Sequence, residues 1–580
     1  MDGFIEFNVI SIHKFSNTMK KILLLFAVLF ALALSAPQAS AITRHVNVSA
    51  LSGELTQALR TQVSGLGYND TIYINFDRLG CDTIRGTITM RCNVVMTGLE
   101  CCKSTVVLDN GIDQPGFSAF DDDTFFAILG SIEHNISVSI TNISFKLKDH
   151  SGIWWADSPK HAVKIYHSNH VTINNVDSYL KNAVCTNFDL RVCSNVSVTN
   201  CNIVNYNNCN AGGCLWFRGN MQNITVADNR FYKYGNDETL GIFSRLVNAE
   251  TGTYGNVVHS NIQIINNDFF YGYEGEDKNF LFNDVQFSLM SGDLSQYSCT
   301  TNNVLVSHNR FHNSDLTKRT MYIGMNPSDS FSNIQFNNNT FIENYIGSVA
   351  RYYRNEIEVN NKSSQNDTIY FRNNIFRNDN PVVNPSNDTG DAYFLIQGGK
   401  LCLDGNTMLN TVTTDTAATD DIGPTLVWCG AQGGDVTLRN NLCRNLKVLA
   451  RISAGGGIQK FKMTASNNSF HGDTRLYCNA IDTLDLVFNN NLIVTPNMDF
   501  FLQEFASIGS VVFNNNNVFV TTNYGKLMTH WNSNPTSSYH FNTLEVKNNL
   551  FRGVTSIDNL LKYITNVTNR DVSGNICVSN

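Results

Sequence analysis

One pattern of apolar and polar positions recurs along most of the chain. Apolar residues stand at positions i and i+2, Asn at i+5 and a further apolar residue, often Phe, at i+7. Copies with this spacing start at Ile224, Ile262, Val304, Ile334, Ile369, Leu401, Val436, Met463, Leu486, Val511 and Leu544, with others at Val171 and Val196 and looser ones at Val138 and Val572. A fixed pattern with spacers of variable length predicts a solenoid with loop insertions.

Each position of the pattern has a structural meaning. Apolar residues at i and i+2 lie on one face of a short strand. The Asn marks a turn, because Asn tolerates the left-handed backbone region and bonds locally to the backbone. Stacked copies would also let successive Asn side chains hydrogen-bond in a ladder. We therefore predict one rung of a parallel β-helix per copy; an Asn-rich β-sandwich would have no reason to repeat the pattern.

The start of the exported chain predicts an end cap. Residues 50–66 form an amphipathic pattern with Leu51, Leu55 and Leu59 at near-helical spacing and Ser52 as N-cap. The first strand is expected at 71–76, and a helix just before it would cover the open end of the coil. We divide the chain into an extension with a signal peptide (1–41), a cap with the first strand (42–76) and one continuous solenoid (77–580).

Composition narrows the class of partner. The chain has 580 residues, of which 16% are charged, and a net charge of −8. No dense Lys/Arg run is present to neutralise phosphates, which argues against a nucleic-acid partner. Many Asn and only 9 Pro fit a structure of strands and turns.

Residues 19–41 resemble a secretory signal. They begin with Met19-Lys-Lys, continue with an apolar core at 22–34 and end in Ala39-Ser-Ala41, a small-x-small cleavage site. The core is too short to be a comfortable membrane span. We expect a protein that is extracellular, periplasmic or at the cell surface, without a membrane span.

Fifteen cysteines are present. An oxidising compartment permits disulfides in the two clusters, and the alternative is thiols packed in the solenoid core. Cys443 and Cys577 occupy the apolar i+7 position, which favours buried thiols there. No CxxC pair exists, which argues against zinc. The clusters comprise Cys81, Cys92, Cys101 and Cys102, and then Cys185, Cys193, Cys201, Cys209 and Cys214.

The helix, the first strand and the repeated rungs together resemble the all-β, right-handed parallel β-helix proteins of the pectin lyase-like superfamily, over about residues 45–577. The resemblance implies this fold. It leaves open a lyase, a hydrolase, a tailspike or an adhesin. The pectate-lyase Trp-x-Asp-His strand and the polygalacturonase set are absent. The Asp121-Asp122-Asp123 run is a solvated turn or a calcium loop.

A candidate site lies on the strand before each copy. If the apolar residues point inward, Lys164, Arg191, Arg218 and Arg245 point outward at intervals of 27 residues. Stacked rungs lie about 4.8 Å apart, so these cations would form one ridge. The aromatic residues expected beside it are Tyr166, Trp216 and Phe243.

A ridge of Arg and aromatic residues suits an acidic polysaccharide, because Arg pairs with carboxylates bidentately. For a lyase we assign Arg218, Arg245 and Lys233 to catalysis, since neighbouring cations shift a basic group toward the neutral form. The expected substrate-binding residues are Lys164, Tyr166, Arg191, Trp216 and Phe243. The expected metal ligands, for Ca²⁺, are Asp237, Glu238, Glu274 and Glu276.

Two further interpretations stay open at this point. Basic side chains on the outside of a β-helix also serve solubility, so the ridge is either a binding groove or a solvated face. His161, His167 and His170 are expected at the surface. The sequence thus predicts a secreted β-helix that binds polysaccharide through rungs 160–290, either as an acidic-glycan lyase or as a non-catalytic adhesin or fibre.

Overall fold

The computed structural model describes the chain with gaps, and all structural statements below concern the described residues. These are residues 40–109, 124–148, 161–181, 186–206, 212–234, 238–271, 285–290, 296–313, 319–343, 355–363, 367–378, 392–410, 425–430, 433–496, 498–521, 525–530, 540–562, 564 and 566–579. The signal segment up to residue 39, the Asp121-Asp122-Asp123 run, Cys185 and Cys209 lie outside them.

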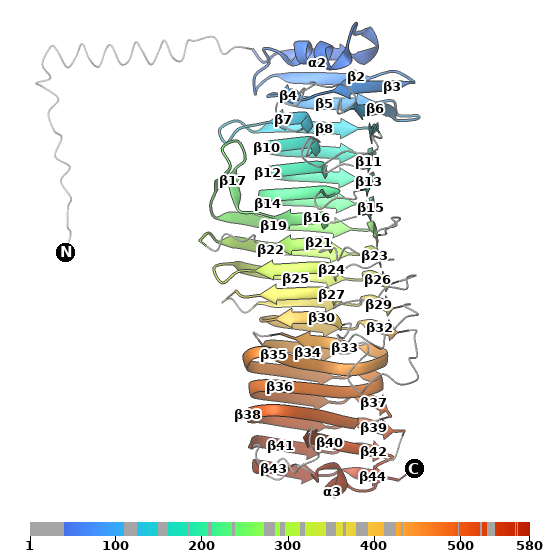
Figure 1. Ribbon diagram of the computed structural model, residues 1–580, viewed down its shortest axis with the longest axis vertical. Coiled ribbons are helices and arrows are strands. Elements are labelled where there is room, and N and C mark those ends of the chain that lie inside the picture. The colour runs from blue at the N-terminus through green and yellow to red at the C-terminus, as the bar shows by residue number, and fades with distance from the viewer. Residues whose placement is uncertain are drawn as a thin grey trace, which may run out of the picture. The chain divides into compact units, whose positions relative to one another are not determined.

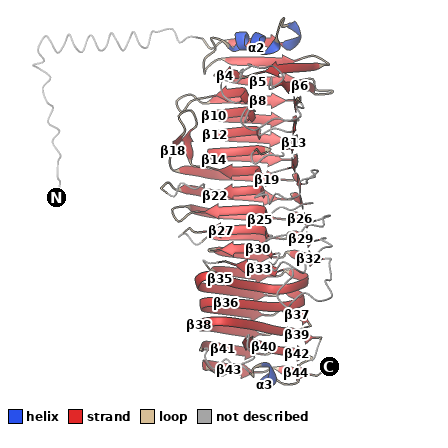
Figure 2. Ribbon diagram, in the orientation of Figure 1, coloured by secondary structure: helices blue, strands red, loops and turns tan. Residues whose placement is uncertain are grey.

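Successive rungs pair in parallel and in register. Ile224 on β14 pairs with Ile262 on β19, and Ile262 pairs with Val304 on β22, so equivalent positions of the repeat lie side by side. Figure 1 shows these strands stacked one above another, and Figure 2 shows that strands dominate, with α2 at one end and α3 at the other. The all-β, right-handed parallel β-helix expected from the sequence is confirmed.

The strands of the first rungs are β1 (Thr43–Asn47), β2 (Thr71–Phe76), β3 (Cys81–Arg85), β4 (Ile88–Met90), β5 (Asn93–Gly98), β6 (Ser104–Asp109), β7 (Thr124–Leu129), β8 (Ile136–Thr141) and β9 (Ile143–Leu147). Those of the middle rungs are β10 (His161–Asn174), β11 (Asp177–Lys181), β12 (Thr186–Thr199), β13 (Asn202–Tyr206), β14 (Leu215–Ala227), β15 (Arg230–Tyr234), β16 (Glu238–Phe243), β19 (Val257–Ile265), β20 (Asp268–Tyr271), β21 (Val285–Met290), β22 (Cys299–Ser307), β23 (Arg310–Asn313), β24 (Arg319–Met325), β25 (Ser330–Asn337) and β26 (Thr340–Glu343).

The remaining rungs comprise β27 (Asn355–Asn361), β28 (Thr368–Arg372), β29 (Ile375–Asn378), β30 (Ala392–Gln397), β31 (Lys400–Asp404), β32 (Thr407–Asn410), β33 (Thr425–Cys429), β34 (Gly434–Arg439), β35 (Leu442–Ser466), β36 (Ser469–Asn489), β37 (Leu492–Thr495), β38 (Met498–Asn514), β39 (Asn517–Val520), β40 (Gly525–His530), β41 (Phe541–Lys547), β42 (Leu550–Arg552), β43 (Val567–Ser573) and β44 (Ile576–Val578). A separate antiparallel pair, β17 (Leu246–Asn248) and β18 (Thr253–Tyr254), projects between β16 and β19, and the short helix α3 spans Ile557–Leu560.

The asparagines of the repeat form a hydrogen-bonded ladder inside the coil. From Asn229 to Asn575, each side-chain Nδ2 donates to the Oδ1 of the equivalent Asn on the next rung, at 2.8–3.1 Å. The same Oδ1 also accepts the backbone N–H of the previous Asn, as Asn406 does for Asn374 at 2.9 Å. Each buried amide is thereby satisfied by its neighbours.

The left-handed residue of the turn is not the ladder Asn but the residue before it. Asn373 has φ 55° and Asn490 has φ 57°, whereas their successors Asn374 and Asn491 supply the ladder. The expectation that one Asn would do both tasks is therefore wrong. One residue adopts the left-handed turn and the next supplies the ladder side chain, because the backbone must reverse at one residue before the next side chain can point inward.

Apolar columns run parallel to the ladder. The Phe residues at i+7 stack face to face, with ring centroids 4.6–5.0 Å apart from Phe231 to Phe376. Cys443 continues this position as a buried thiol, and Cys577 as a half-buried one. The cysteines whose side chains are described are all free thiols.

The helix expected over 50–66 is present as α2 (Leu55–Val63) and packs against β3 and β4. Its N-cap is Glu54, whose carboxylate accepts from the backbone N–H groups of Thr56 and Gln57, so the prediction of Ser52 was wrong. Leu59 is fully buried against the first rungs. The role of helix α2 as an end cap stays a prediction. Within the described residues, no helix is both long and apolar enough to cross a membrane.

We expect Asn374→Ala to lower the free energy of unfolding by about 3 kcal/mol. The change removes the acceptor of Asn339 and the donor to Phe336 O and Asn406 Oδ1, and it leaves these buried groups unpaired. The measurement is the urea midpoint. Asn302→Ala, on the half-buried side of β22, is the control and should change little. Equal midpoints for the two variants would contradict a stabilising ladder.

Candidate functional site

The register of the strands divides the expected ridge into two files of side chains. Arg191 pairs with Arg218, and their file includes Tyr166 and Phe243. Lys164 instead belongs to the file of Asp189 and Trp216. The prediction that four cations would form a single ridge at intervals of 27 residues is therefore wrong. An interval of 27 residues along the chain does not make two residues partners across rungs, because the length of the loop between the strands sets which residues pair.

Two of the three residues assigned to catalysis are buried. Arg245 lies beyond the end of β16, where its Nη2 is 2.7 Å from Asp329 Oδ1 and both side chains are inaccessible to solvent. Lys233 is also fully buried and donates to Asn205 Oδ1 at 3.0 Å and to the Gly212 carbonyl. Both cations hold loops and strands together. Their assignment to catalysis is wrong, because no substrate can reach them in this arrangement.

Asp189 is the centre of the side chains that do come together. Its carboxylate is fully buried, and its Oδ2 accepts from Arg191 Nη2 at 2.6 Å. Arg218 Nε lies 3.3 Å from Oδ1, and His161 Nε2 lies 3.3 Å from Oδ2. Burial raises the pKa of Asp189, but His161, Arg218 and Arg191 together lower it below its ordinary value. Asp189 is therefore a carboxylate at neutral pH.

The Arg218 guanidinium contacts two aromatic rings. Its guanidinium carbon is 4.4 Å from the Trp216 ring centroid and 5.2 Å from that of Phe243. Gly241 makes room for this arrangement, since a Cβ there would meet the Phe243 ring at 2.7 Å. Burial lowers the pKa of the guanidinium, and Asp189 opposes that shift. The side chain is 24% exposed, and its terminal nitrogens bond to no described residue.

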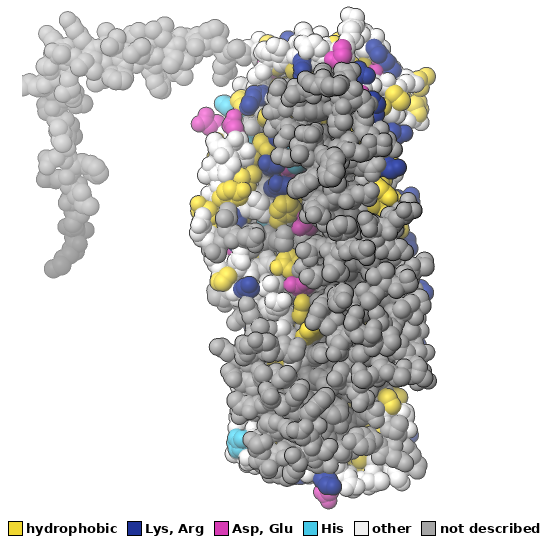
Figure 3. Space-filling model, viewed as in Figure 1, with side chains coloured by type: hydrophobic (Ala, Val, Ile, Leu, Met, Phe, Trp, Pro, Cys, Tyr) yellow, Lys and Arg dark blue, Asp and Glu magenta, His cyan; other side chains and the backbone are white. Residues whose placement is uncertain are grey.

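The remaining expected binding residues are less accessible than the ridge required. Lys164, Tyr166 and Trp216 are all buried. The Tyr166 ring packs against Leu246 and Ala249 at the β17–β18 projection and contacts the Arg191 guanidinium at 4.9 Å. Lys164 and Tyr166 therefore offer little surface to a ligand, and Arg191 is held by Asp189 and the Tyr166 ring. Figure 3 shows Lys and Arg side chains beside hydrophobic ones on the upper half of one face.

His161 and His167 are buried, contrary to the expectation of surface histidines, whereas His170 is exposed. His167 Nε2 accepts from the backbone N–H of Ala249 at 3.0 Å and thereby holds the β17–β18 projection. Burial lowers the pKa of His161 to about 3, so its imidazole is neutral at pH 7. Its Nδ1 has no hydrogen-bond partner. Its Nε2 lies near both an acceptor and a donor, 3.3 Å from Asp189 Oδ2 and 3.4 Å from Arg191 Nη2.

The expected calcium ligands are mostly outside the described residues. Asp237, Glu274 and Glu276 are among those that the structure does not describe, and Glu238 begins β16. Within the described residues, no group of three or more His, Cys, Asp or Glu side chains could hold a metal ion. Calcium at these loops stays a prediction.

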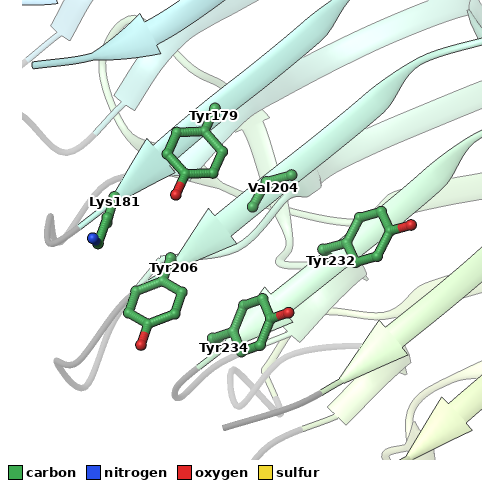
Figure 4. Close-up of a pocket in the computed structure, with 6 residues that line it drawn as sticks. All are labelled: Tyr179, Lys181, Val204, Tyr206, Tyr232 and Tyr234. Atoms are coloured by element: carbon green, nitrogen blue, oxygen red, sulfur yellow. The ribbon is translucent and has the colours of Figure 1, made fainter. Parts of the chain in front are cut away.

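A second region, which was not predicted from the sequence, lies on the outer face of β11, β13 and β15. A cavity of about 340 Å³ is lined there by Tyr179, Lys181, Val204, Tyr206, Tyr232 and Tyr234, which we call the tyrosine slot. Figure 4 shows Val204 between Tyr179 and Tyr232. The signal was present in the sequence, since Tyr alternates with inward residues in the Arg-Phe-Tyr-Lys-Tyr run of 230–234. Only the register brings these runs together.

No protein-family model and no curated protein matches the chain. Among solved structures, DFA-IIIase from Arthrobacter chlorophenolicus A6 in complex with GF2 is 11% identical, covering 75% of this chain and 94% of that one at a TM-score of 0.35. The mannuronan C-5 epimerase AlgE6 A-module of Azotobacter vinelandii is 13% identical, with 73% and 98% covered and a TM-score of 0.36. PfbA, a surface adhesin of Streptococcus pneumoniae, is 13% identical, with 92% of each chain covered and a TM-score of 0.32.

Likenesses at this level leave the function to be argued from the chain's own residues. The fold is a parallel β-helix, as the sequence predicted, and membership of the pectin lyase-like superfamily stays a prediction.

We expect the free energy of unfolding to decrease as the pH is lowered, because His161 is buried in its neutral form. Its folded pKa is about 3, whereas an unfolded histidine has a pKa of roughly 6.5. Between these values the unfolded chain binds a proton that the folded chain does not, so acidification favours unfolding. His161→Gln removes this contribution, and its urea midpoint should fall less steeply than that of the wild type from pH 6.5 to pH 4. Parallel curves for the two proteins would contradict a buried neutral His161.

Proposed function

We propose that this β-helix binds an acidic polysaccharide and that Arg218 receives a carboxylate of the glycan. The observation that carries the proposal is the guanidinium over the rings of Trp216 and Phe243, which contact each other edge to face, with its Nε directed toward Asp189. The two rings restrict the orientation of the planar group. Its terminal nitrogens, which bond to no described residue, are the donors for a ligand.

A carboxylate fits these donors better than a neutral hydroxyl does. Arg presents parallel N–H groups that match two carboxylate or sulfate oxygens, and such charge-assisted pairs are stronger than neutral hydrogen bonds. Asp189 compensates part of the positive charge from the protein side and holds Arg191 and Arg218 together. A side chain held in one orientation loses little entropy when it binds. The expected export signal would bring the protein to glycans outside the cytoplasm.

Cleavage by β-elimination is a second candidate function, because pairing of a uronate carboxylate with Arg218 makes the C5 proton of that sugar more acidic. In the reaction a base takes the C5 proton, the C4–O4 bond breaks, a C4–C5 double bond forms, and the leaving oxygen takes a proton from water. His161, Lys233 and Arg245 are all buried, and the Nδ1 of His161 is inaccessible, so none of the three is assigned as the base.

For the binding function we expect Arg218→Lys to weaken affinity for uronate oligosaccharides about ten-fold, because Lys keeps the charge but loses the planar, bidentate group. The measurement is isothermal titration with oligogalacturonate and oligomannuronate. Arg372→Lys is the matched control, since Arg372 also stacks on an aromatic ring, Tyr370, at 4.1 Å, but on β28. Equal affinity of Arg218→Lys and the wild type would refute the proposed role of Arg218.

For the cleavage function we expect absorbance near 235 nm to rise when the protein meets the same acidic polysaccharides, because β-elimination forms an unsaturated uronate. Arg218→Lys should slow the rise, because it loses the bidentate pairing with the uronate carboxylate. A flat trace from a wild-type protein that binds would leave a non-catalytic adhesin or fibre as the function. A rise of unchanged rate in Arg218→Lys would remove Arg218 from the reaction.

A further inference from the structure

The tyrosine slot is formed by a missing ring in a column of aromatic side chains. Along one outward file, Tyr179 pairs with Val204, and Val204 pairs with Tyr232. Further along the same file, Tyr232, Phe270 and His312 stack with ring centroids 4.7 Å apart and planes within 8° of parallel. Val204 interrupts this column because its side chain is too short to continue the stack.

The gap above Val204 has the thickness of one ring. Rungs are spaced by about 4.8 Å, so Tyr179 and Tyr232, two rungs apart, project from the sheet roughly 9.5 Å apart. A ring inserted midway would lie about as far from each tyrosine as Phe270 lies from Tyr232. The cavity of about 340 Å³ is at the small end of the range for ligand pockets, which suits a single sugar residue.

We propose that the tyrosine slot is a second carbohydrate-binding site, which takes one pyranose ring of a glycan between Tyr179 and Tyr232. A pyranose has apolar C–H faces for the two tyrosine rings and hydroxyls around its edge. The side chains of Lys181, Tyr206 and Tyr234 lie along the file beside Val204 and line the same cavity. A purely apolar ring would make no use of these groups.

The exposure and the contacts of the lining side chains support a site that can accept a ligand. Tyr179 is 42% exposed, and Tyr206 and Tyr232 are half-buried. The hydroxyls of these three residues bond to no described residue, so they can pair with sugar hydroxyls. Tyr206 and Tyr234 hold each other in place, with ring centroids 4.9 Å apart and planes inclined by 37°. The Lys181 ammonium lies 5.8 Å from the Tyr206 ring.

This site is separate from the Arg218 cluster in chemistry and in position. The slot lies on β11, β13 and β15, whereas Arg218 and its partners lie on β10, β12, β14 and β16. The slot recognises a ring and its hydroxyls and needs no carboxylate. The slot therefore extends the proposed function to neutral sugar residues. Binding of a neutral sugar there does not depend on Arg218.

The test is to fill the slot. Val204→Phe completes the aromatic column, as Phe270 does two rungs further on, and should fold normally because the position is half-buried and faces outward. Ile342→Phe, in the same file on β26, is the matched control. The probe is an array of neutral hexose, pentose and N-acetylhexosamine oligosaccharides, with titration of the strongest one. Circular dichroism and the urea midpoint check the fold.

We expect Val204→Phe to lose at least ten-fold in affinity for the neutral oligosaccharide, with Ile342→Phe and Arg218→Lys unchanged. Tyr232→Ala, which removes one wall, should lose a similar amount. Wild-type protein that binds none of the neutral sugars, or Val204→Phe that binds as the wild type does, would overturn the proposal. Loss of neutral binding in Arg218→Lys would show that the two regions are one site and would also overturn it.

Discussion

The asparagine ladder is the interaction on which the rest of the structure depends. Each ladder Asn takes its side-chain and backbone acceptor from the next rung and donates to a carbonyl of an earlier one, as Asn374 does to Asn406 and to Phe336 O. A rung displaced by one residue would bury unpaired amides, which is costly. The ladder therefore fixes the register of neighbouring rungs, and the register decides which outward side chains become neighbours.

Outward side chains have two different environments on this solenoid. In the Asp189 cluster they are drawn together by charge, because a buried carboxylate requires cations and hydrogen-bond donors around it. In the tyrosine slot they are held apart, because Val204 leaves a gap that neither neighbouring ring fills. One region thus offers oriented charge and the other a shaped space. The binding of acidic and of neutral parts of a glycan is proposed for these two regions of the same few rungs.

Three basic residues, Lys233, Arg245 and Arg218, have different roles in the structure although they carry the same charge. Lys233 follows the copy that starts at Ile224, whereas Arg218 and Arg245 lie before the copies that start at Ile224 and Ile262. Lys233 satisfies polar groups inside the coil, Arg245 is paired with Asp329, and Arg218 alone of the three keeps terminal nitrogens without a described partner. The difference arises from the residues that each meets across rungs, which lie tens of residues away in the chain.

The sequence by itself determined the fold class, the alignment of the rungs and the existence of the ladder, since a pattern repeated at fixed internal spacing has one economical way to bury its apolar and amide groups. It also placed Arg218, Trp216 and Phe243 on one face. Tertiary structure alone decided that Arg245 and Lys233 are buried, that Asp189 and His161 are central, and that Val204 opens a slot between two tyrosines. These outcomes depend on loop lengths and on register between strands, which local periodicity does not encode.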